Sequence, residues 1–241
     1  MTACLKRLLH AQEFFPGFLG IFVNPFFIAR RGLVKNVSAV AGEISGRILD
    51  VGCGSKPYKS LFTFTEYIGV DIENPGHDHA SEDVDVIYDG KTLPFEANSF
   101  DSVITNQVFE HVFHPAEFLA EIHRVLKPGG KLLLTVPFVW DEHEQPYDFA
   151  RYSSFGVKHS LESNGFEIVT FRKSVSNIGV VFQLGILYIY KLTRTSSTWL
   201  NRLLVLILIS PMTIAGVVLS AILPSNEDLY LDNIVIAVKR G

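Results

Sequence analysis

Residues 48–58 read ILDVGCGSKPY, and this stretch decides the fold. Its first four residues are a largely apolar run, typical of a buried strand, that ends directly at Gly52 and Gly54. Glycine lets the backbone turn sharply and come close to a ligand. Asp71 follows Asp50 by 21 residues, at the end of the next apolar run, where a carboxylate can accept both hydroxyls of a ribose. The pattern predicts a site for an adenosine-containing cofactor at the first strand crossover.

Apolar runs and helical patterns alternate along the chain on both sides of this stretch. Short apolar runs predict further strands over 67–70, 84–88, 102–105, 131–136, 166–171 and 234–238. Helical spacing predicts helices over 33–44, 116–126 and 157–163, and KPGG at 127–130 stops the second of them. This alternation implies an α/β fold, a doubly wound and mostly parallel sheet of seven strands. Ligands of such sheets bind at the carboxyl ends of the strands.

The composition is more apolar than that of an ordinary soluble enzyme. The 241 residues are 48% hydrophobic and 19% charged, and the mean hydropathy is +0.25. A net charge of −4 gives no basic surplus, so no nucleic-acid partner is expected. The two cysteines, Cys4 and Cys53, are too few for a disulfide framework and fit a reducing compartment.

Three apolar segments account for this hydropathy. Residues 14–28 are interrupted by prolines and glycines, which predicts an interfacial or core-covering arm over 1–32. Residues 175–190 and 203–223 carry no charge, and the second run is about 32 Å long as a helix, close to the thickness of a hydrocarbon core. Pro211 predicts a kink in it. We therefore expect a helical insertion over 175–225 within an α/β domain formed by 33–174 and 226–241.

Two interpretations of the insertion remain open, namely contact with a membrane surface and burial in a homodimer interface. The connecting stretch contains Lys191, Arg194 and Arg202 and no acidic residue. A membrane-spanning hairpin would export these three cations, against the positive-inside tendency. An in-plane or re-entrant helical pair avoids that conflict. The expectation is peripheral or monotopic attachment to the cytoplasmic side of a membrane, with a cytoplasmic location as the alternative.

A dinucleotide is the alternative cofactor, because its fingerprint G-x-G-x-x-G begins in the same way. In this sequence Pro57 takes the third glycine position, although Lys56 offers a charge for a phosphate. No Tyr-x-x-x-Lys pair of a short-chain dehydrogenase is present in the sequence. LDVGCG, the VD that ends at Asp71, LPFEANSFDSVITNQVFEHV and EIHRVLKPGGKLLLTVP follow in order. This series resembles the class I S-adenosylmethionine-dependent methyltransferases, in particular the type 11 methyltransferase domain, over Ser45 to Phe171.

The resemblance implies S-adenosylmethionine as cofactor and assigns the residues that hold it. Asp50, Gly52 and Gly54 form the loop under its methionine part, and Asp71 binds the ribose. Cys53 lies in this loop as a small residue and not as a nucleophile. The remaining residues implied are Asp89 for the adenine amino group with Gly90 beside it, and Asn106 and Gln107 for backbone contacts to the methionine end. Glu110 and His111 match the EH of the family, whereas the usual third glycine is replaced near Lys56.

Catalytic candidates follow the strand over 131–136, in the polar and aromatic segment Trp140 to Tyr152. Its HEQPYDFARY run, residues 143–152, resembles one common in bacterial methyltransferases of this type. His143 suits a general base near neutral pH, and Tyr147 and Arg151 are spaced to share a helical face. Alternatively, His143 and Arg151 hold this segment through Asp148 or Glu144, and His111 is a second candidate base.

Residues 77–79, His-Asp-His, lack a matching ligand cluster, so we expect a solvated loop there and no metal site. The sequence thus predicts a methyltransferase that uses S-adenosylmethionine and modifies a small-molecule or lipid-linked acceptor at a membrane. The alternatives are a soluble small-molecule methyltransferase that dimerises through the insertion, and a membrane scaffold without turnover.

Overall fold

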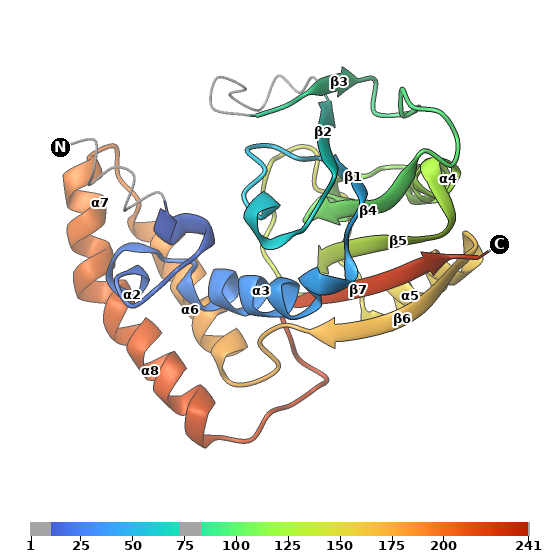
Figure 1. Ribbon diagram of the computed structural model, residues 1–241. Helices are drawn as coiled ribbons and strands as arrows, with labels where there is room; N and C mark the ends of the chain where they lie inside the picture. The colour runs from blue at the N-terminus through green and yellow to red at the C-terminus, as the bar shows by residue number, and fades with distance from the viewer. Residues whose placement is uncertain (1–10, 73–82, 241) are drawn as a thin grey trace. The chain divides into compact units, whose positions relative to one another are not determined.

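The computed structural model describes residues 11–72 and 83–240. Two compact units make up the chain (Figure 1). The helical unit combines Met1–Asn36 with Lys173–Leu231, and the sheet unit combines Val37–Arg172 with Asp232–Gly241. The amino-terminal arm and the insertion, which the sequence presents as separate segments, therefore belong to one unit.

A single mixed sheet forms the centre of the sheet unit. Within the described residues it has seven strands in the order β3-β2-β1-β4-β5-β7-β6. Their bounds are β1 Arg47–Val51, β2 Glu66–Ile72, β3 Val86–Tyr88, β4 Phe100–Asn106, β5 Leu126–Pro137, β6 Phe166–Lys173 and β7 Asp232–Lys239. The ladders that join β1 to β2 and β4, β2 to β3, and β4 to β5 are parallel, and β7 is antiparallel to β5. The predicted doubly wound, mostly parallel sheet is confirmed.

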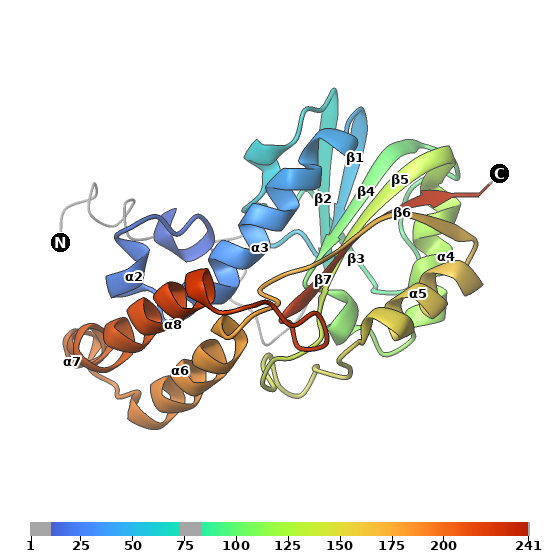
Figure 2. The ribbon, with the colours of Figure 1, turned by 90° about the horizontal axis from the view of Figure 1, so that it is seen from below.

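Helix α4 (Pro115–Val125) and helix α5 (Ser154–Ser163) lie side by side against the sheet (Figure 2). Proline at the first turn of α4 suits a position that needs no N–H donor. Phe118, Leu119, Ile122 and Val125 follow at helical spacing and are all buried. Together with the apolar residues of β1, β4 and β5 they form the main hydrophobic core.

The structure corrects the boundary predicted after α4. The KPGG stretch ends the helix as expected, but it lies inside β5 and not before it. Leu126 is already paired with Phe100, and the register shifts before Lys131 pairs with Ser102. Gly129, with a φ of +74°, takes the backbone through this irregularity. The short helices of the unit are the 3-10 turns η1 (Ala41–Glu43), η2 (Lys59–Leu61) and η4 (Phe109–His111).

The helices of the helical unit whose bounds lie within the described residues are α2 (Gly20–Val23), α3 (Phe27–Val40), α6 (Gly179–Thr193), α7 (Thr198–Leu204), the π-helical turn η5 (Val205–Ile209) and α8 (Ser210–Ile222). Helix α3 begins six residues before the predicted helix and continues into the sheet unit. Gln183 of α6 is fully buried and bonds both Pro25 O, at 3.0 Å, and Ala29 N, at 3.1 Å. This side chain fixes α6 against the start of α3.

Helices α7 and α8 and the turn between them form one helix of 25 residues, Thr198–Ile222. Proline has no N–H to complete the helical ladder, and the irregularity that Pro211 predicts takes the form of the π-helical turn directly before it. The Ser210 hydroxyl donates to Val205 O at 3.1 Å, and the Thr213 hydroxyl donates to Ile209 O at the same distance. These bonds satisfy carbonyls around the irregular turn.

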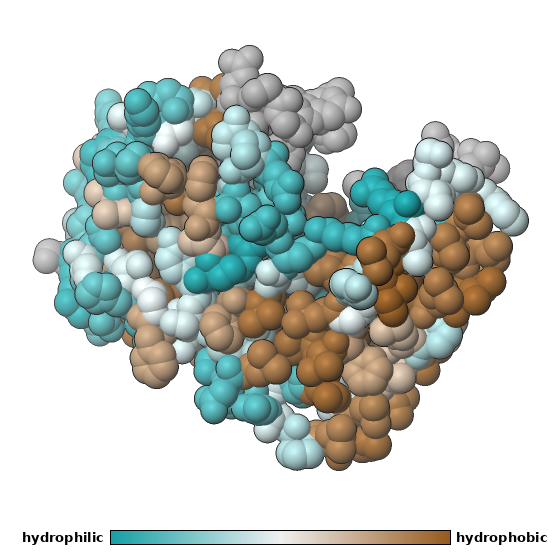
Figure 3. Space-filling view, turned by 180° about the vertical axis from the view of Figure 1, so that it is seen from behind, coloured by the Kyte–Doolittle hydropathy of each residue, from teal (hydrophilic) through white to brown (hydrophobic). Residues whose placement is uncertain are grey.

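The outer surface of this long helix is apolar. Its length and composition suffice to cross a membrane, and only 28% of its most apolar window is buried. Large apolar side chains are exposed along it, at Trp199, Leu206, Ile207, Ile214, Val218 and Ile222. Figure 3 shows apolar residues gathered over this part of the surface. A core helix of a soluble protein would be mostly buried, so among residues 11–72 and 83–240 nothing covers one face of this helix.

Candidate functional site

The turn after β1 is shaped by two glycines in the left-handed region. Gly52 has a φ of +71°, and a Cβ on it would lie 2.4 Å from Val108 Cγ2. The turn therefore packs directly against the segment that follows β4, and only glycine fits there. Gly54 has a φ of +46°, and its N–H donates to Asp71 Oδ2 at 2.9 Å. Asp71, at the carboxyl end of β2, is thereby fixed beside the β1 turn.

Gly54 differs from Gly52 in what surrounds it. Apart from its chain neighbours, no atom of residues 11–72 and 83–240 lies within 4 Å of the position that a Cβ on Gly54 would take. The backbone at the carboxyl end of β1 therefore borders open space, where ligands of parallel sheets bind. Asp50 and Asp71 flank it, and carboxylates suit the positive charges and ribose hydroxyls of S-adenosylmethionine. The residues present fit that cofactor.

Asp50 is buried, with 6% of its surface exposed, and its Oδ2 accepts a hydrogen bond from the Tyr67 hydroxyl at 2.6 Å. Burial raises the pKa of its carboxyl to about 6, although the Tyr67 hydrogen bond opposes the shift. Burial also raises the pKa of the Cys53 thiol strongly. Cys53 therefore stays a neutral thiol at physiological pH, which is not the reactive form of a cysteine.

Lys56 lies near the position of the missing third glycine, and its backbone adopts a conformation that usually requires glycine. Its φ is +50°, the conformation in which glycine is favoured, and its side chain is only 2% exposed. The ammonium lies 2.7 Å from Asp85 Oδ2 and 3.4 Å from Asp83 Oδ1. Lys56 is thus engaged in ion pairs, and between β1 and β2 the chain forms only the 3-10 turn η2. A pyrophosphate would find neither a free lysine nor the amino terminus of an α-helix in this segment.

The other predicted cofactor residues follow β3 and β4. Asp89 caps the turn after β3, where its Oδ1 accepts from Lys91 N and Thr92 N, both at 2.9 Å, and Gly90 has a φ of +75°. These hydrogen bonds hold the pKa of the Asp89 carboxyl below its usual value. Asn106 Oδ1 accepts from the Thr135 hydroxyl at 2.7 Å. Gln107 follows with a φ of +56°, so the backbone turns at the end of β4.

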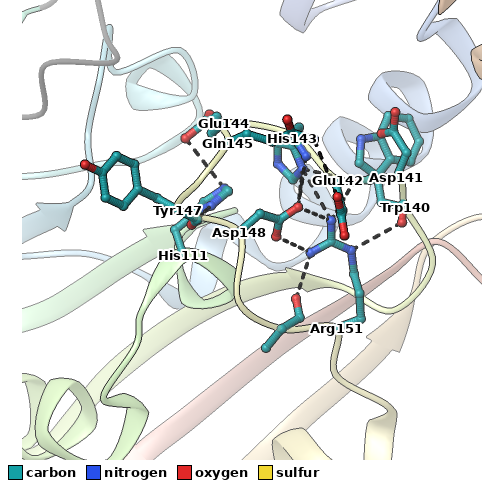
Figure 4. Close-up of polar contacts among 11 residues, drawn as sticks. His111, Trp140, Asp141, Glu142, His143, Glu144, Gln145, Tyr147, Asp148 and Arg151 are labelled. Carbon is teal, nitrogen blue, oxygen red and sulfur yellow. Dashed lines mark hydrogen bonds and ion pairs between the residues drawn. The ribbon is translucent and has the colours of Figure 1, made fainter.

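The segment between β5 and α5, residues 138–153, is called the lid segment below. It contains no helix, so the prediction that Tyr147 and Arg151 share a helical face is wrong. Instead, Arg151 forms a bidentate pair with Asp148, with both N–O distances at 2.5 Å (Figure 4). Arg151 also donates to Asp141 O at 2.6 Å. Burial raises the pKa of the Asp148 carboxyl, but the Arg151 pair outweighs burial and brings the pKa to about 2.

His143 lies beside this pair. Its backbone N–H donates to Asp148 Oδ2 at 2.9 Å, and its Nδ1 is 3.2 Å from the same oxygen and from Asp141 O. Burial, and then the neighbouring His111, lower the pKa of its imidazole. The ring is therefore neutral at pH 7 and able to accept a proton. Tyr147 lies in the same segment with 41% of its surface exposed, and its ring points away from the Asp148 and Arg151 pair (Figure 4).

Glu110 is a site residue to which the sequence assigned no role. It lies on η4, after β4, and is fully buried. Its backbone oxygen accepts from Phe149 N at 2.9 Å and Ala150 N at 3.2 Å, which joins η4 to the lid segment. Burial raises the pKa of its carboxyl to about 8. A usable signal was present, because η4 and the lid segment follow the carboxyl ends of adjacent parallel strands.

The structure therefore brings the predicted residues to one edge of the sheet unit. The cofactor candidates lie in or directly after the carboxyl ends of β1, β2, β3 and β4, and the catalytic candidates lie after β5. Within this arrangement the Arg151 guanidinium forms an ion pair with the Asp148 carboxylate. Residues 77–79 lie outside the described residues.

Comparison with known proteins agrees with this geometry. Residues 49–134 match the family model of a methyltransferase domain. A phthiotriol/phenolphthiotriol dimycocerosates methyltransferase of Mycobacterium ulcerans is 38% identical over 39% of this chain and 38% of its own length. A demethylmenaquinone methyltransferase of Renibacterium salmoninarum is 38% identical over 44% of this chain and 46% of its own length. The alignments thus span less than half of these relatives.

Solved structures share the fold. An S-adenosylmethionine-dependent methyltransferase from Mesorhizobium loti superposes with a TM-score of 0.53 at 13% identity, and the match covers 88% of this chain and all of that one. This similarity shows the fold. Residues 49–134 form a methyltransferase domain, in agreement with the class I S-adenosylmethionine-dependent methyltransferase domain of type 11 predicted from the sequence.

Proposed function

We propose that the protein transfers a methyl group from S-adenosylmethionine to a membrane-associated or lipid-linked acceptor. The observation that carries the choice of acceptor is the apolar and largely unburied helix Thr198–Ile222. It follows the lid segment and β6 in the chain, so one polypeptide combines a methyltransferase site with a surface suited to lipid.

Methyl transfer requires the protein to position the acceptor and the cofactor more than to form covalent bonds with them. When bound, S-adenosylmethionine supplies a methyl group on a sulfonium that is already activated for in-line attack. Asp71 and the β1 turn would hold the cofactor, and alignment of the acceptor would supply most of the rate enhancement. His143, neutral at pH 7, is the candidate base for an acceptor that must lose a proton.

The helical unit supports attachment from one side of the membrane. The long helix measures about 37 Å at 1.5 Å per residue, somewhat more than the hydrocarbon thickness. Arg194 and Ser197 lie at the α6–α7 connection, with Lys191 and Arg202 on either side. Because export of these cations is disfavoured, we propose monotopic or peripheral attachment to the cytoplasmic leaflet.

The names of two relatives support an apolar acceptor. One is named for phthiotriol and phenolphthiotriol dimycocerosates and the other for demethylmenaquinone. The first name is lipid-related and the second is that of a quinone methyltransferase. The proposal extends that acceptor class to this chain.

Vesicle flotation and methyl incorporation test the proposal together. The full chain is mixed with vesicles of phosphatidylethanolamine and phosphatidylglycerol, and it should float with them. A triple variant, Leu206→Ser, Ile207→Ser and Val218→Ser, should stay in the dense fraction, because these side chains are 50%, 58% and 53% exposed. Phe155→Ser on α5, where the ring is 81% exposed, is the matched control and should float.

The same preparations are then incubated with labelled S-adenosylmethionine and a membrane extract. Label should enter the organic phase with the parent chain and fall at least tenfold with the triple variant. Label confined to water-soluble products, or a parent chain that forms a stable dimer without binding vesicles, would contradict membrane action. The dimer result would favour burial of the apolar face between two copies.

A further inference from the structure

A buried carboxylate near the lid segment accepts no hydrogen bond from any of the residues that the structure describes. Glu110 is 0% exposed, and neither of its side-chain oxygens forms a hydrogen bond. Its position is not accidental, because the two backbone bonds from Phe149 and Ala150 fix it against the lid segment. A buried carboxylate without a hydrogen-bond donor is costly, and the charge of Arg151 offsets only part of the cost of burial, since the pKa of Glu110 stays raised. A proton or a bound cation would offset the rest.

Two imidazoles share the surroundings of this carboxylate. One carboxylate oxygen of Glu110, one ring nitrogen of His111 and one of His143 all lie within 4.8 Å of one another. The two rings meet edge to face, with their centroids 4.8 Å apart. His111 Nε2 is buried and makes no hydrogen bond. These groups reach one place from η4 and from the lid segment, and the two histidines are 32 residues apart in sequence.

The Nδ1 atoms of both rings face oxygen acceptors. His111 Nδ1 lies 2.8 Å from Tyr147 O, and a carbonyl can only accept, so Nδ1 carries the proton. His143 Nδ1 lies 3.2 Å from both Asp148 Oδ2 and Asp141 O, closer than its 3.4 Å contact with Arg151 Nη2. Each ring therefore presents Nε2 with a free lone pair. Histidines that bind metals are commonly oriented in this way by a carbonyl or a carboxylate.

We propose that Glu110, His111 and His143 bind a divalent transition-metal ion such as Zn²⁺. Two imidazoles and one carboxylate are a ligand set of catalytic zinc and non-haem iron sites, which keep a coordination position open. Metal–ligand bonds of about 2.0–2.2 Å place tetrahedral ligand atoms roughly 3.5 Å apart, so the three side chains close by about 1 Å on binding. The ion would add a positive charge in direct contact with the Glu110 carboxylate, which the Arg151 charge only partly compensates.

Glu144 lies at the solvent-exposed edge of the proposed metal site. Glu144 Oε2 lies 3.6 Å from His111 Nε2, and the Glu144 side chain is 41% exposed. It can approach the ion or hold a water bound to it. With metal present, His143 is a ligand and not a base, and an oxygen bound at the open position loses its proton more readily. The inference concerns metal binding and does not rest on the proposed methyl transfer.

Metal binding is tested directly on the tag-free full chain after treatment with a chelator. Equilibrium dialysis against Zn²⁺, with metal counted by mass spectrometry, should give one tight ion per chain. Co²⁺ in its place should give the visible absorption of a site with protein ligands. His111→Ala, His143→Ala and Glu110→Gln should each weaken binding at least tenfold, because even outer-sphere changes cost about 10- to 100-fold.

Two controls separate this site from other histidines. His159→Ala removes an exposed histidine on α5, and the double variant His77→Ala with His79→Ala removes the histidines of the 77–79 run. Both should bind as the parent does. Zn²⁺ should raise the melting temperature of the parent and not of Glu110→Gln, which keeps the side-chain volume. Absence of a tight ion in the parent, or parent-like affinity in all three ligand variants, would overturn the proposal.

Discussion

Replacement of Gly54 by alanine distinguishes the contribution of this glycine to stability from its contribution to cofactor binding. The added Cβ meets no atom of another described residue within 4 Å beyond its chain neighbours, so its structural cost is that of the left-handed backbone, about 1–2 kcal/mol. Alanine also lowers the conformational entropy of the unfolded chain, which offsets roughly 0.4–1 kcal/mol of that backbone cost. We therefore expect Gly54→Ala to lower the free energy of unfolding by about 1 kcal/mol.

The effect on cofactor binding should be larger. If the open space beside Gly54 is where the methionine part of the cofactor lies, the new methyl group overlaps it. Overpacking by a methyl group costs about 1–3 kcal/mol, which corresponds to roughly a 5- to 150-fold increase in the dissociation constant of S-adenosylmethionine. Titration calorimetry measures this constant, and urea unfolding measures the stability of the same samples.

Gly129 provides the matched control. It also has a left-handed backbone, with a φ of +74°, and no atom within 4 Å of its Cβ position. It lies near the start of β5, away from the carboxyl edge of the sheet. Gly129→Ala should lose similar stability and bind the cofactor as the parent does. Equal affinities for the parent and Gly54→Ala would refute the placement of the cofactor at this turn.

Three further substitutions probe the charged groups of the site. The pKa of Asp50 is raised from 3.8 to about 6, so its carboxyl stabilises the folded state below pH 3.8, and that contribution is lost as the pH rises through 6. At pH 7, Asp50→Asn should therefore have a free energy of unfolding about 3 kcal/mol higher than that of the parent, measured by urea unfolding. Equal stabilities at pH 7 would exclude the shift. Asp71→Asn should weaken S-adenosylmethionine binding about 10- to 100-fold by calorimetry, since a hydrogen bond to a charged group contributes about 1.5–3 kcal/mol; an unchanged constant would remove Asp71 from the site. Arg151→Ala leaves the buried Asp148 carboxylate unpaired and should lower stability by about 3 kcal/mol, and an unchanged urea midpoint would show that the pair contributes nothing.

The sequence predicts the strands of this fold because their signals are local. ILDV before two glycines, and the run KLLLTV at 131–136, are apolar stretches of strand length, and both are buried strands in the structure. The start of β5 is not predictable in this way. Leu126 joins the sheet only because Phe100 lies opposite it, and that pairing depends on residues far apart in the chain.

The same distinction between local signals and long-range contacts applies to the residues of the site. The roles of Gly52, Gly54 and Asp71 follow from a turn and a spacing, both of which are visible in the sequence. The cluster of Glu110, His111 and His143 depends on the adjacency of β4 and β5, which the sequence does not state. Lys56 is a third case, because its left-handed backbone and buried ion pairs show how the chain departs from the glycine pattern of the family.

The grouping of the apolar segments also required the structure. The amino-terminal arm and the insertion are separated by more than 140 residues, and nothing in either segment indicates the other. Gln183 joins them through bonds to Pro25 and Ala29, which no periodicity predicts. The exposed face of α8, in contrast, follows from composition, because the run 203–223 has more apolar residues than its packing partners can cover.

The central claim is that the β1 turn binds S-adenosylmethionine and not a nicotinamide dinucleotide. Titration calorimetry of the full chain with each of the two ligands tests it most directly. The account predicts one molecule of S-adenosylmethionine bound per chain and no heat with the dinucleotide. A silent titration with S-adenosylmethionine, or saturable binding of the dinucleotide, would contradict it.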